Sequence, residues 1–388
     1  MPPELHPHTA LVRPSAPNAD PWRASAPPLY QTATFAQESA AGFGPYDYTR
    51  TDNPTRALLE SELARLEGGA RALTYASGMG ALAAVLRGLA PGQRVLASED
   101  LYGGTLRLLE SELGSRGVSV DYAPLWGREE SDRPFEGAPD LVLVEGCSNP
   151  LARVADVRGL ARRAHAGGGR LCVDNTALSP LLLRPLELGA DLVVHSATKW
   201  LGGHGDLTAG VVACGDARLA EELASRRNAD GSGLAPFEAW LLARGLKTLA
   251  VRLERSQASA QLLAERLEQH PAVRRTHYAG LSAHPECALL RSQAQGAGAL
   301  VSFETGDVEA SLRLVDALSQ FTIAVSFGGV SSQASLPCRM SHASVPAHLR
   351  RLPPDLVRLS VGLEHVEDLW DDLAGALDRC VRPAVAVS

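Results

Sequence analysis

Lys199 is the residue in this sequence whose surroundings best suit covalent chemistry. It follows an apolar run, Leu192 to Val194, that predicts the end of a buried strand, and several glycines come soon after it. A lysine in that place can form a Schiff base with a carbonyl cofactor, of which pyridoxal phosphate is the obvious one. The hydroxyl groups of Ser196 and Thr198 would then bind the cofactor phosphate. The competing interpretation is a surface lysine in a glycine-rich loop.

Asp174 is the second residue that suits this chemistry. It ends a short apolar strand, RLCVDN, 25 positions before Lys199, which is about one crossover between parallel strands. Pyridoxal phosphate needs an anion beside its pyridine nitrogen, because the protonated ring accepts electrons. Two neighbouring parallel strands would present the acid and the lysine at one edge of a sheet. The alternative role for Asp174 is the N-cap of a following helix.

Two further stretches place suitable groups after predicted strands. A strand over residues 72–76 leads through a small-residue turn into a helix over about 79–90. The N–H groups of Gly78 and Met79 are therefore expected to form an anion site, with a plain helix start as the alternative. Tyr102 lies in the loop after the next strand, where its ring would stack on a flat cofactor or be simply half-buried near a turn.

Other polar groups are suited to bind a substrate. Arg358 lies in an apolar strand, VRLSVGLE, where a buried guanidinium would bind a carboxylate or form a structural salt bridge. The strand within residues 140–150 runs into Glu145 and Asn149. The loop over residues 324–337 is rich in hydroxyl groups and glycine, which makes it a candidate substrate loop.

The elements that must position these residues alternate between strand and helix. This rhythm predicts an α/β fold, a parallel sheet with helices on both faces, with ligands at the carboxyl ends of its strands. Residues 1–55 are expected to form an irregular arm that packs on a partner subunit. Residues 56–254 would form a large cofactor-binding domain and residues 255–388 a smaller α+β domain. One long helix over residues 236–270 would link the two domains.

The composition is that of an ordinary globular protein: 388 residues, 45% hydrophobic and 21% charged, with a formal net charge of −7. Nothing in it favours a nucleic-acid or anionic-membrane partner. No apolar run approaches the roughly 20 residues of a membrane-spanning helix, and no signal peptide is evident, so we expect a cytoplasmic protein. The six cysteines show no metal spacing and are expected to be free thiols.

Motifs along nearly the whole chain resemble one family, the pyridoxal-phosphate enzymes of trans-sulfuration. That family includes cystathionine γ-synthase, cystathionine γ-lyase and methionine γ-lyase. The resemblance is carried by PPLYQTATF, YDYTRTDNPT, ASGMGA, DLYGGT, VDNTALSP, HSATKWLGGHGDLTAG, WLLARGLKTL, the SFGG loop and RLSVGLE. It implies pyridoxal-phosphate fold type I and a homotetramer built from two active dimers.

The resemblance also implies a role for each matching residue. Lys199 would carry the Schiff base, Asp174 would partner the pyridine nitrogen, and Tyr102 would stack on the ring and help in proton transfer. The residues implied to hold the phosphate are Gly78, Met79, Ser196, Thr198 and, from the neighbouring subunit, Tyr48 and Arg50. The residues implied to contact the substrate are Asn149, Ser326, Arg358, Val325 and Arg107.

Several positions depart from the family pattern. The motif Glu-(Ser/Thr)-Pro-x-Asn-Pro is here EGCSNP, residues 145–150. The other departures are Ala177 for an aromatic residue, Trp200 for tyrosine and Gly205 for serine. Val325 replaces the glutamate of many cystathionine-handling members and resembles methionine γ-lyase, whereas Gly104 and Arg107 resemble the cystathionine group. The two indications disagree, so the substrate stays open.

The function that we expect is a carbon–sulfur lyase, with cystathionine γ-lyase as the first candidate. The alternatives within the family are γ-replacement on an O-acylhomoserine with cysteine, and methionine γ-lyase. A third class is a metal-dependent hydrolase that uses His195, His204 and Asp206, although their spacing fits no standard ligand pattern. A fourth is a non-catalytic protein with the cofactor fold.

Overall fold

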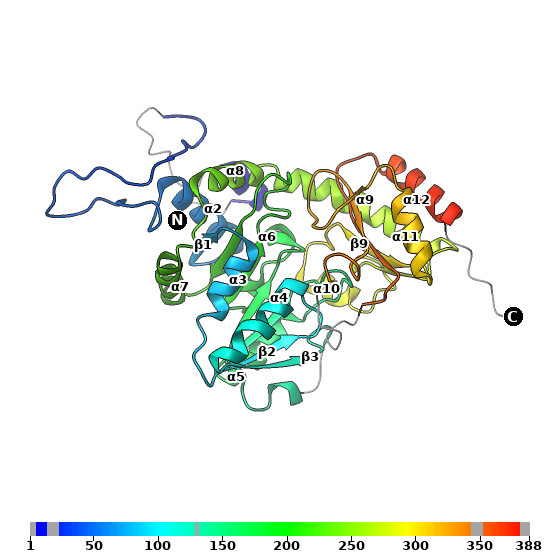
Figure 1. Cartoon of the computed structure of the whole chain (residues 1–388), viewed down its shortest axis with the longest axis horizontal. Coiled ribbons are helices and arrows are strands. Elements are labelled where there is room, and N and C mark those ends of the chain that lie inside the picture. Colours follow the sequence, from blue (N-terminus) through cyan, green and yellow to red (C-terminus); the bar gives the residue numbers. More distant parts are fainter. Residues whose placement is uncertain (1–4, 14–22, 129–131, 343–351, 381–388) are drawn as a thin grey trace.

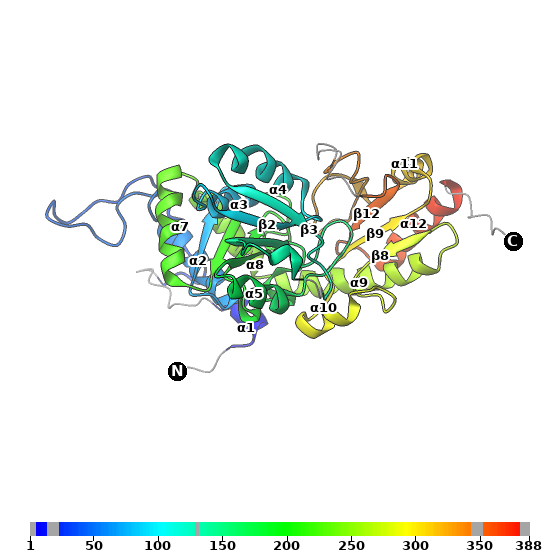
Figure 2. The ribbon, with the colours of Figure 1, turned by 90° about the horizontal axis from the view of Figure 1, so that it is seen from below.

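Two β-sheets organise the chain (Figures 1 and 2). The structure is a computed structural model that describes residues 5–13, 23–128, 132–342 and 352–380. A seven-stranded sheet lies in the part of the chain drawn from blue to green, and a five-stranded sheet in the part drawn from yellow to red. Among the described residues, no helix is both long and apolar enough to cross a membrane.

The large sheet is mostly parallel, as the sequence predicts. Its strand order is β1-β7-β6-β5-β4-β2-β3. Strand β7 is antiparallel to its two neighbours, β1 and β6. The strands are β1 (Arg71–Tyr75), β2 (Arg94–Ser98), β3 (Ser119–Ala123), β4 (Leu141–Glu145), β5 (Arg170–Asp174), β6 (Leu192–Ser196) and β7 (Gly210–Cys214). Both faces of such a sheet are covered, which explains why the central strands are nearly continuous apolar runs.

Helices cover both faces of the large sheet (Figure 2). One face carries α3 (Gly78–Leu86), α4 (Gly103–Leu108) and α7 (Ala217–Asp230), whose buried leucines share one core cluster. The other face carries α2 (Pro54–Glu67), α5 (Val157–Ala166), the short α6 (Ser179–Leu182) and α8 (Pro236–Leu246). Helix α3 ends about one turn earlier than the sequence predicts, and Gly88 and Pro91 follow it closely.

The small sheet has the order β10-β11-β12-β9-β8 and is mostly antiparallel. Its strands are β8 (Arg275–His277), β9 (Leu300–Glu304), β10 (Thr322–Ile323), β11 (Gln333–Ser335) and β12 (Leu356–Ser360). The helices of this region are α9 (Leu249–Gln269), α10 (Cys287–Gln293), α11 (Val308–Ala317) and α12 (Val366–Cys380). A mostly antiparallel sheet with separate helices is the α+β arrangement expected for the second domain.

The predicted long helix over residues 236–270 is wrong. The chain forms α8 and α9 instead, and it breaks at Lys247 and Thr248. The carbonyl oxygen of Gly245 accepts from Thr248 N at 3.2 Å and from Arg252 Nη2 at 2.9 Å, so it is engaged by the turn. The predicted domain boundary at residues 254 and 255 falls inside α9, and the division into domains stays a prediction.

The N-terminal arm is less irregular than predicted. Helix α1 (Pro7–Val12) begins with a proline, which suits a first helical turn, and buries Ala10 and Leu11. Residues 23–53 contain no helix or strand, and this segment extends away from the body of the molecule (Figure 1). The rest of the predicted arm, residues 1–4 and 14–22, lies outside the described residues.

Candidate active site

The carboxyl ends of β4, β5 and β6 open onto a cavity of about 350 Å³. Most of the site residues predicted from the sequence line it, although they come from both sheets and from five loops. These residues are Gly78, Met79, Tyr102, Asn149, Asp174, Ser196, Thr198, Lys199, Val325, Ser326 and Arg358. The candidate residues therefore meet where parallel sheets bind their ligands.

Lys199 lies in the turn that follows β6 and points into this cavity. Its Nζ donates to Ser326 Oγ at 2.5 Å and lies 5.1 Å from the centroid of the Phe327 ring. Burial lowers the pKa of Lys199 to about 8, and the positive charge of Arg358 makes a smaller contribution to the same shift. A lysine that loses its proton so readily is suited to act as a nucleophile and a base.

Asp174 ends β5 and is held by the residue two positions later. Its Oδ1 accepts from Thr176 N at 2.9 Å and from Thr176 Oγ1 at 2.5 Å, while Ser196 N donates to Thr176 Oγ1 at 2.8 Å. Burial raises the pKa of Asp174, and the two bonds from Thr176 oppose that shift. Among the described residues the bonds to Asp174 go to Oδ1, which leaves Oδ2 for a ligand.

The turn between β1 and α3 forms a cradle against Ser196. A Cβ atom on Gly78 would lie 2.7 Å from Ser196 Cβ, so glycine is the residue that fits there. Gly78 and Met79 open α3, and their N–H groups have no partner within the helix. Ser77 caps the helix by accepting from Gly80 N at 3.1 Å. A helix start of this kind is suited to bind an anion, and an anion site here stays a prediction.

Arg358 reaches the cavity from β12 of the small sheet and is almost fully buried. Its Nη1 donates to Asn149 Oδ1 at 3.1 Å, and its Nη2 donates to the Ser326 carbonyl oxygen at 2.5 Å. Burial lowers the pKa of Arg358 to about 10. Ser326 has a φ of +91°, a backbone conformation that costs energy for a residue with a side chain. These bonds fix the guanidinium at the cavity wall, in a place where a planar cation could bind a carboxylate.

Tyr102 precedes α4 and faces the same cavity. Its backbone N–H donates to Glu145 Oε1 at 2.6 Å, and a Cβ atom on Gly104 would lie 2.4 Å from its ring atom Cε1. The ring, about 39% exposed, is free to stack on a ligand.

Three predicted residues do not line this cavity. Arg107 lies on α4, while Tyr48 and Arg50 lie on the extended arm. Arg50 Nη1 donates to the carbonyl oxygen of Asn228 at 2.7 Å, and its guanidinium lies 5.6 Å from the Tyr48 ring centroid. The two arm residues are thus together, but away from the cavity of their own chain.

Several lining residues had no role assigned from the sequence. Thr176 had a local signal, since an aspartate followed two residues later by threonine is typical of an Asx turn. Glu145 was identified only as part of a motif. The remaining unassigned residues that line the cavity are Ser77, Leu82, Thr105, Cys147, Ala177, Thr208, Phe327 and Ser341. No disulfide joins the six cysteines, and burial raises the pKa of Cys147 to about 12.

The metal-site hypothesis finds no support in the described residues, among which no group of three His, Cys, Asp or Glu side chains could hold an ion. His195 is buried and bonds to Glu67 on α2. His204 lies in the loop after Lys199, with Nδ1 2.8 Å from the Gly202 carbonyl oxygen.

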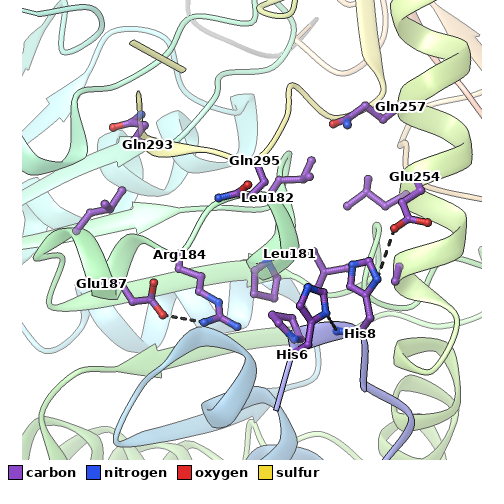
Figure 3. Close-up of a pocket in the computed structure, with 15 residues that line it drawn as sticks. His6, His8, Leu181, Leu182, Arg184, Glu187, Glu254, Gln257, Gln293 and Gln295 are labelled. Atoms are coloured by element: carbon purple, nitrogen blue, oxygen red, sulfur yellow. Dashed lines mark hydrogen bonds and ion pairs between the residues drawn. The ribbon is translucent and has the colours of Figure 1, made fainter. Parts of the chain in front are cut away.

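A second cavity, of about 550 Å³, lies between α1, α6 and α9 (Figure 3). Its charged side chains pair with one another: His8 Nδ1 lies 3.5 Å from Glu254 Oε1, and Arg184 Nη1 lies 2.8 Å from Glu187 Oε1. It offers no buried lysine or arginine, so the candidate chemistry belongs to the first cavity.

Comparisons with known proteins agree with this site. Residues 8–378 match the model of the family described as Cys/Met metabolism PLP-dependent enzyme. The chain belongs to that family. It is 48% identical over 361 residues to a chloroplastic cystathionine beta-lyase of Mimosa pudica, which covers 92% of this chain and 79% of the relative.

Two further relatives cover this chain almost completely. A cystathionine beta-lyase of Bacillus subtilis is 42% identical over 353 residues, 90% of each chain. The crystal structure of cystathionine gamma synthase from Xanthomonas oryzae pv. oryzae, in complex with aminoacrylate and cysteine, superposes with a TM-score of 0.94. It is 40% identical and covers 97% of this chain and 98% of that one. The chain is therefore an enzyme of trans-sulfuration with pyridoxal-phosphate fold type I.

The residues present fit pyridoxal phosphate, the cofactor of this family. The glycine cradle at Gly78 suits its phosphate, and the open oxygen of Asp174 suits its ring nitrogen. Lys199, with its lowered pKa, suits its aldehyde. The bonds that hold Asp174 and the Gly78 turn leave those groups open to a ligand, whereas Lys199 Nζ donates to Ser326 Oγ.

Proposed function

We propose that this enzyme is a carbon–sulfur lyase that acts on cystathionine and breaks the bond between sulfur and the β-carbon. The observation that carries the proposal is that Lys199, Asp174 and Arg358 share one cavity. They supply a base, an anion for the cofactor ring and a clamp for the carboxylate of an amino acid. This combination suits a reaction that begins at the α-carbon.

Arg358 and Asn149 would orient the substrate. A guanidinium that is already bonded to Asn149 Oδ1 and to the Ser326 carbonyl oxygen keeps its plane fixed. A carboxylate that binds there in bidentate fashion would be held in one orientation, in the cavity that Lys199 also lines.

Lys199 would remove the α-proton. Bound pyridoxal phosphate supplies the electron sink for the charge that develops on the α-carbon. As the carbon–sulfur bond breaks, its electron pair goes to sulfur, and the departing thiolate takes a proton. Tyr102 and Lys199 are the groups at the cavity that can donate it.

The relatives favour cleavage at the β-carbon over the γ-cleavage that the sequence alone led us to expect. Two of them are cystathionine beta-lyases at 48% and 42% identity. Cleavage at the β-carbon also needs fewer proton transfers, because γ-elimination requires removal of a second proton from the β-carbon. Val325 is 55% exposed at the cavity, so the distal amine of cystathionine would not find a carboxylate there.

Product analysis tests this function. Purified enzyme is incubated with L-cystathionine, and the oxo acid and thiol are identified. We expect pyruvate, homocysteine and ammonia; 2-oxobutyrate and cysteine would instead show γ-cleavage. Parallel reactions with methionine, and with O-succinylhomoserine plus cysteine, test for methionine γ-lyase activity and for γ-replacement. Turnover in the last mixture alone would overturn the lyase proposal. The control variant Lys199→Ala should lose both turnover and the visible absorption of covalently bound cofactor.

We further propose that the enzyme is a cytoplasmic homotetramer of two active dimers, in which Tyr48 and Arg50 reach the phosphate of the neighbouring subunit. Support comes from their position on a segment that extends from the body of the molecule (Figure 1), and from their absence among the residues that line the cavity. Its partners would be small amino acids, with no nucleic acid or membrane involved.

A further inference from the structure

Glu145 is a half-buried acid that lines the cavity, and the mechanism gives it no role. It ends β4 and lies opposite Asp174 in the register of the two parallel strands. The residues that follow it, Gly146 and Cys147, occupy positions where the chain departs from the family motif. A carboxyl group in this place carries a desolvation cost, so its contacts should explain why it is there.

The two carboxyl oxygens of Glu145 join two loops of the site. Oε1 accepts from Tyr102 N at 2.6 Å, in the loop after β2. Oε2 accepts from Asn149 N at 3.1 Å, in the loop after β4. One side chain thus fixes the backbone of the residue that faces the cofactor ring and of the residue that bonds to Arg358.

We propose that Glu145 is a positioning residue, whose carboxyl group sets where Tyr102 stacks on the cofactor and where Asn149 and Arg358 hold the substrate carboxylate. The inference rests on the proposed function, because it assigns Tyr102 to the ring and Arg358 to an amino-acid carboxylate. In this proposal Glu145 acts on the cofactor and the substrate indirectly, through the backbone N–H groups of Tyr102 and Asn149.

The charges around Glu145 agree with this role. Burial raises the pKa of Glu145 well above its ordinary value, and the negative charges of Asp174 and Asp100 add to this shift. A neutral acid at this position still accepts both hydrogen bonds, and it adds no second negative charge beside Asp174.

The variant Glu145→Gln separates these contacts. Glutamine has the same shape, but its amide nitrogen donates, so one of the two backbone N–H groups meets a donor instead of an acceptor. Glu145→Gln loses one hydrogen bond and should lower kcat/KM about fivefold. Glu145→Ala loses both bonds and should lower kcat/KM about thirtyfold or more. The loss should divide between a higher KM, through Asn149, and a lower kcat, through Tyr102.

Asp140 provides a matched control at the opposite end of the same strand. Its Oδ1 accepts from Gln93 Nε2 at 2.9 Å and its Oδ2 accepts from Arg94 N at 2.8 Å, so it also joins two segments with one carboxyl group. Asp140→Asn should lower the melting temperature and leave kcat and KM at their wild-type values.

The experiment compares the holoenzymes of wild type, Glu145→Gln, Glu145→Ala and Asp140→Asn. Steady-state kinetics with cystathionine gives kcat and KM, and visible circular dichroism reports the asymmetric surroundings of the bound cofactor. We expect the kinetic constants and the dichroism to change in the two Glu145 variants, and to stay at their wild-type values in Asp140→Asn. Wild-type kinetics and dichroism in Glu145→Gln would overturn the proposal, as would equal losses in Asp140→Asn. Failure of the wild type to cleave any sulfur amino acid would refute the proposed function, whereas the dichroism would still test Glu145.

Discussion

The acid–base behaviour of Lys199 is the residue-scale property on which turnover depends. Burial and Arg358 lower its pKa from 10.5 to about 8. A lowered pKa makes the neutral amine available at a lower pH than for an exposed lysine. The side chain can therefore accept the α-proton under mildly alkaline conditions, without a separate base to activate it.

A pH profile tests this assignment. Below about pH 8, kcat should fall about tenfold for each pH unit, because the neutral fraction of Lys199 falls in that proportion. Above pH 8 it should level off. The measurement is kcat at saturating cystathionine from pH 6 to 9, with visible absorption at each pH as the control that cofactor stays bound. A flat profile between pH 6.5 and 9 would contradict the role of Lys199 as the base.

Gly104 determines where the Tyr102 ring can lie. An added Cβ would approach Tyr102 Cε1 to 2.4 Å and Met79 Sδ to 3.0 Å, so Gly104→Ala should push the ring away from the cofactor. Losing a stacking contact of about 1 kcal/mol should lower kcat about fivefold.

The control for Gly104 is Gly80→Ala, where the added atom would lie 3.5 Å from Ser77 Oγ, an ordinary contact. Kinetics and visible dichroism of both variants are compared with the wild type. If Gly104→Ala matches the wild type in both measurements, the ring is not constrained by this glycine.

At the scale of elements, the break between α8 and α9 supports the loop that carries Lys199. Arg252, buried on α9, donates from Nη1 to the Trp200 carbonyl oxygen at 2.8 Å and from Nη2 to the Gly245 carbonyl oxygen at 2.9 Å. Gly245 packs so closely that its Cβ would lie 2.4 Å from the Gly202 carbonyl oxygen. The helix break and the lysine loop are therefore one packed unit.

The variant Gly245→Ala tests this packing. Because the atom it meets is backbone, the loop must move, and the free energy of unfolding should fall by about 1–3 kcal/mol. The melting temperature and the fraction of bound cofactor should both drop. Gly114→Ala is the control, since that glycine has a helical φ of −58° and nothing within 4 Å of the added atom. A Gly245→Ala enzyme as stable as Gly114→Ala would contradict the close contact.

The elements that the sequence predicts well are those with local causes. The apolar runs that end at Asp174 and Ser196 are buried strands, and the polar residues after them do face the cavity. The helix break at Thr248 was not predicted, because no local apolar pattern marks it; the flanking residues Gly245 and Arg252 contact the distant loop that holds Trp200 and Gly202. The sequence pointed to Glu145 as a polar residue at a strand end but not to its contacts, since one of its two bonds goes to the loop after another strand.

At the scale of the whole molecule, the site exists because two sheets meet at one cavity. Arg358 and Asn149 are 209 positions apart and bond directly, and Lys199 bonds to Ser326 across 127 positions. Residue spacing alone could not predict these pairs; the family resemblance implied that the four residues share one site, without implying which of them bond. Since both bonds cross between the two regions, any relative movement of the regions would change the substrate clamp and the lysine together.

The arm raises the question of how many chains make one site. If Arg50 serves the neighbouring subunit, then a Lys199→Ala chain and an Arg50→Ala chain can repair each other. In a mixed dimer, the Arg50→Ala chain keeps its own lysine and receives an intact arm from its partner, so one of the two sites is complete. Refolding the two inactive variants at equal amounts should restore about a quarter of wild-type activity, because half of the dimers are mixed and each has one complete site. The measurement is cystathionine cleavage before and after co-refolding, with each variant refolded alone as the control. If mixing restores nothing, Arg50 acts on the cavity of its own chain, and its bond to the Asn228 carbonyl oxygen then marks its working position rather than a resting one.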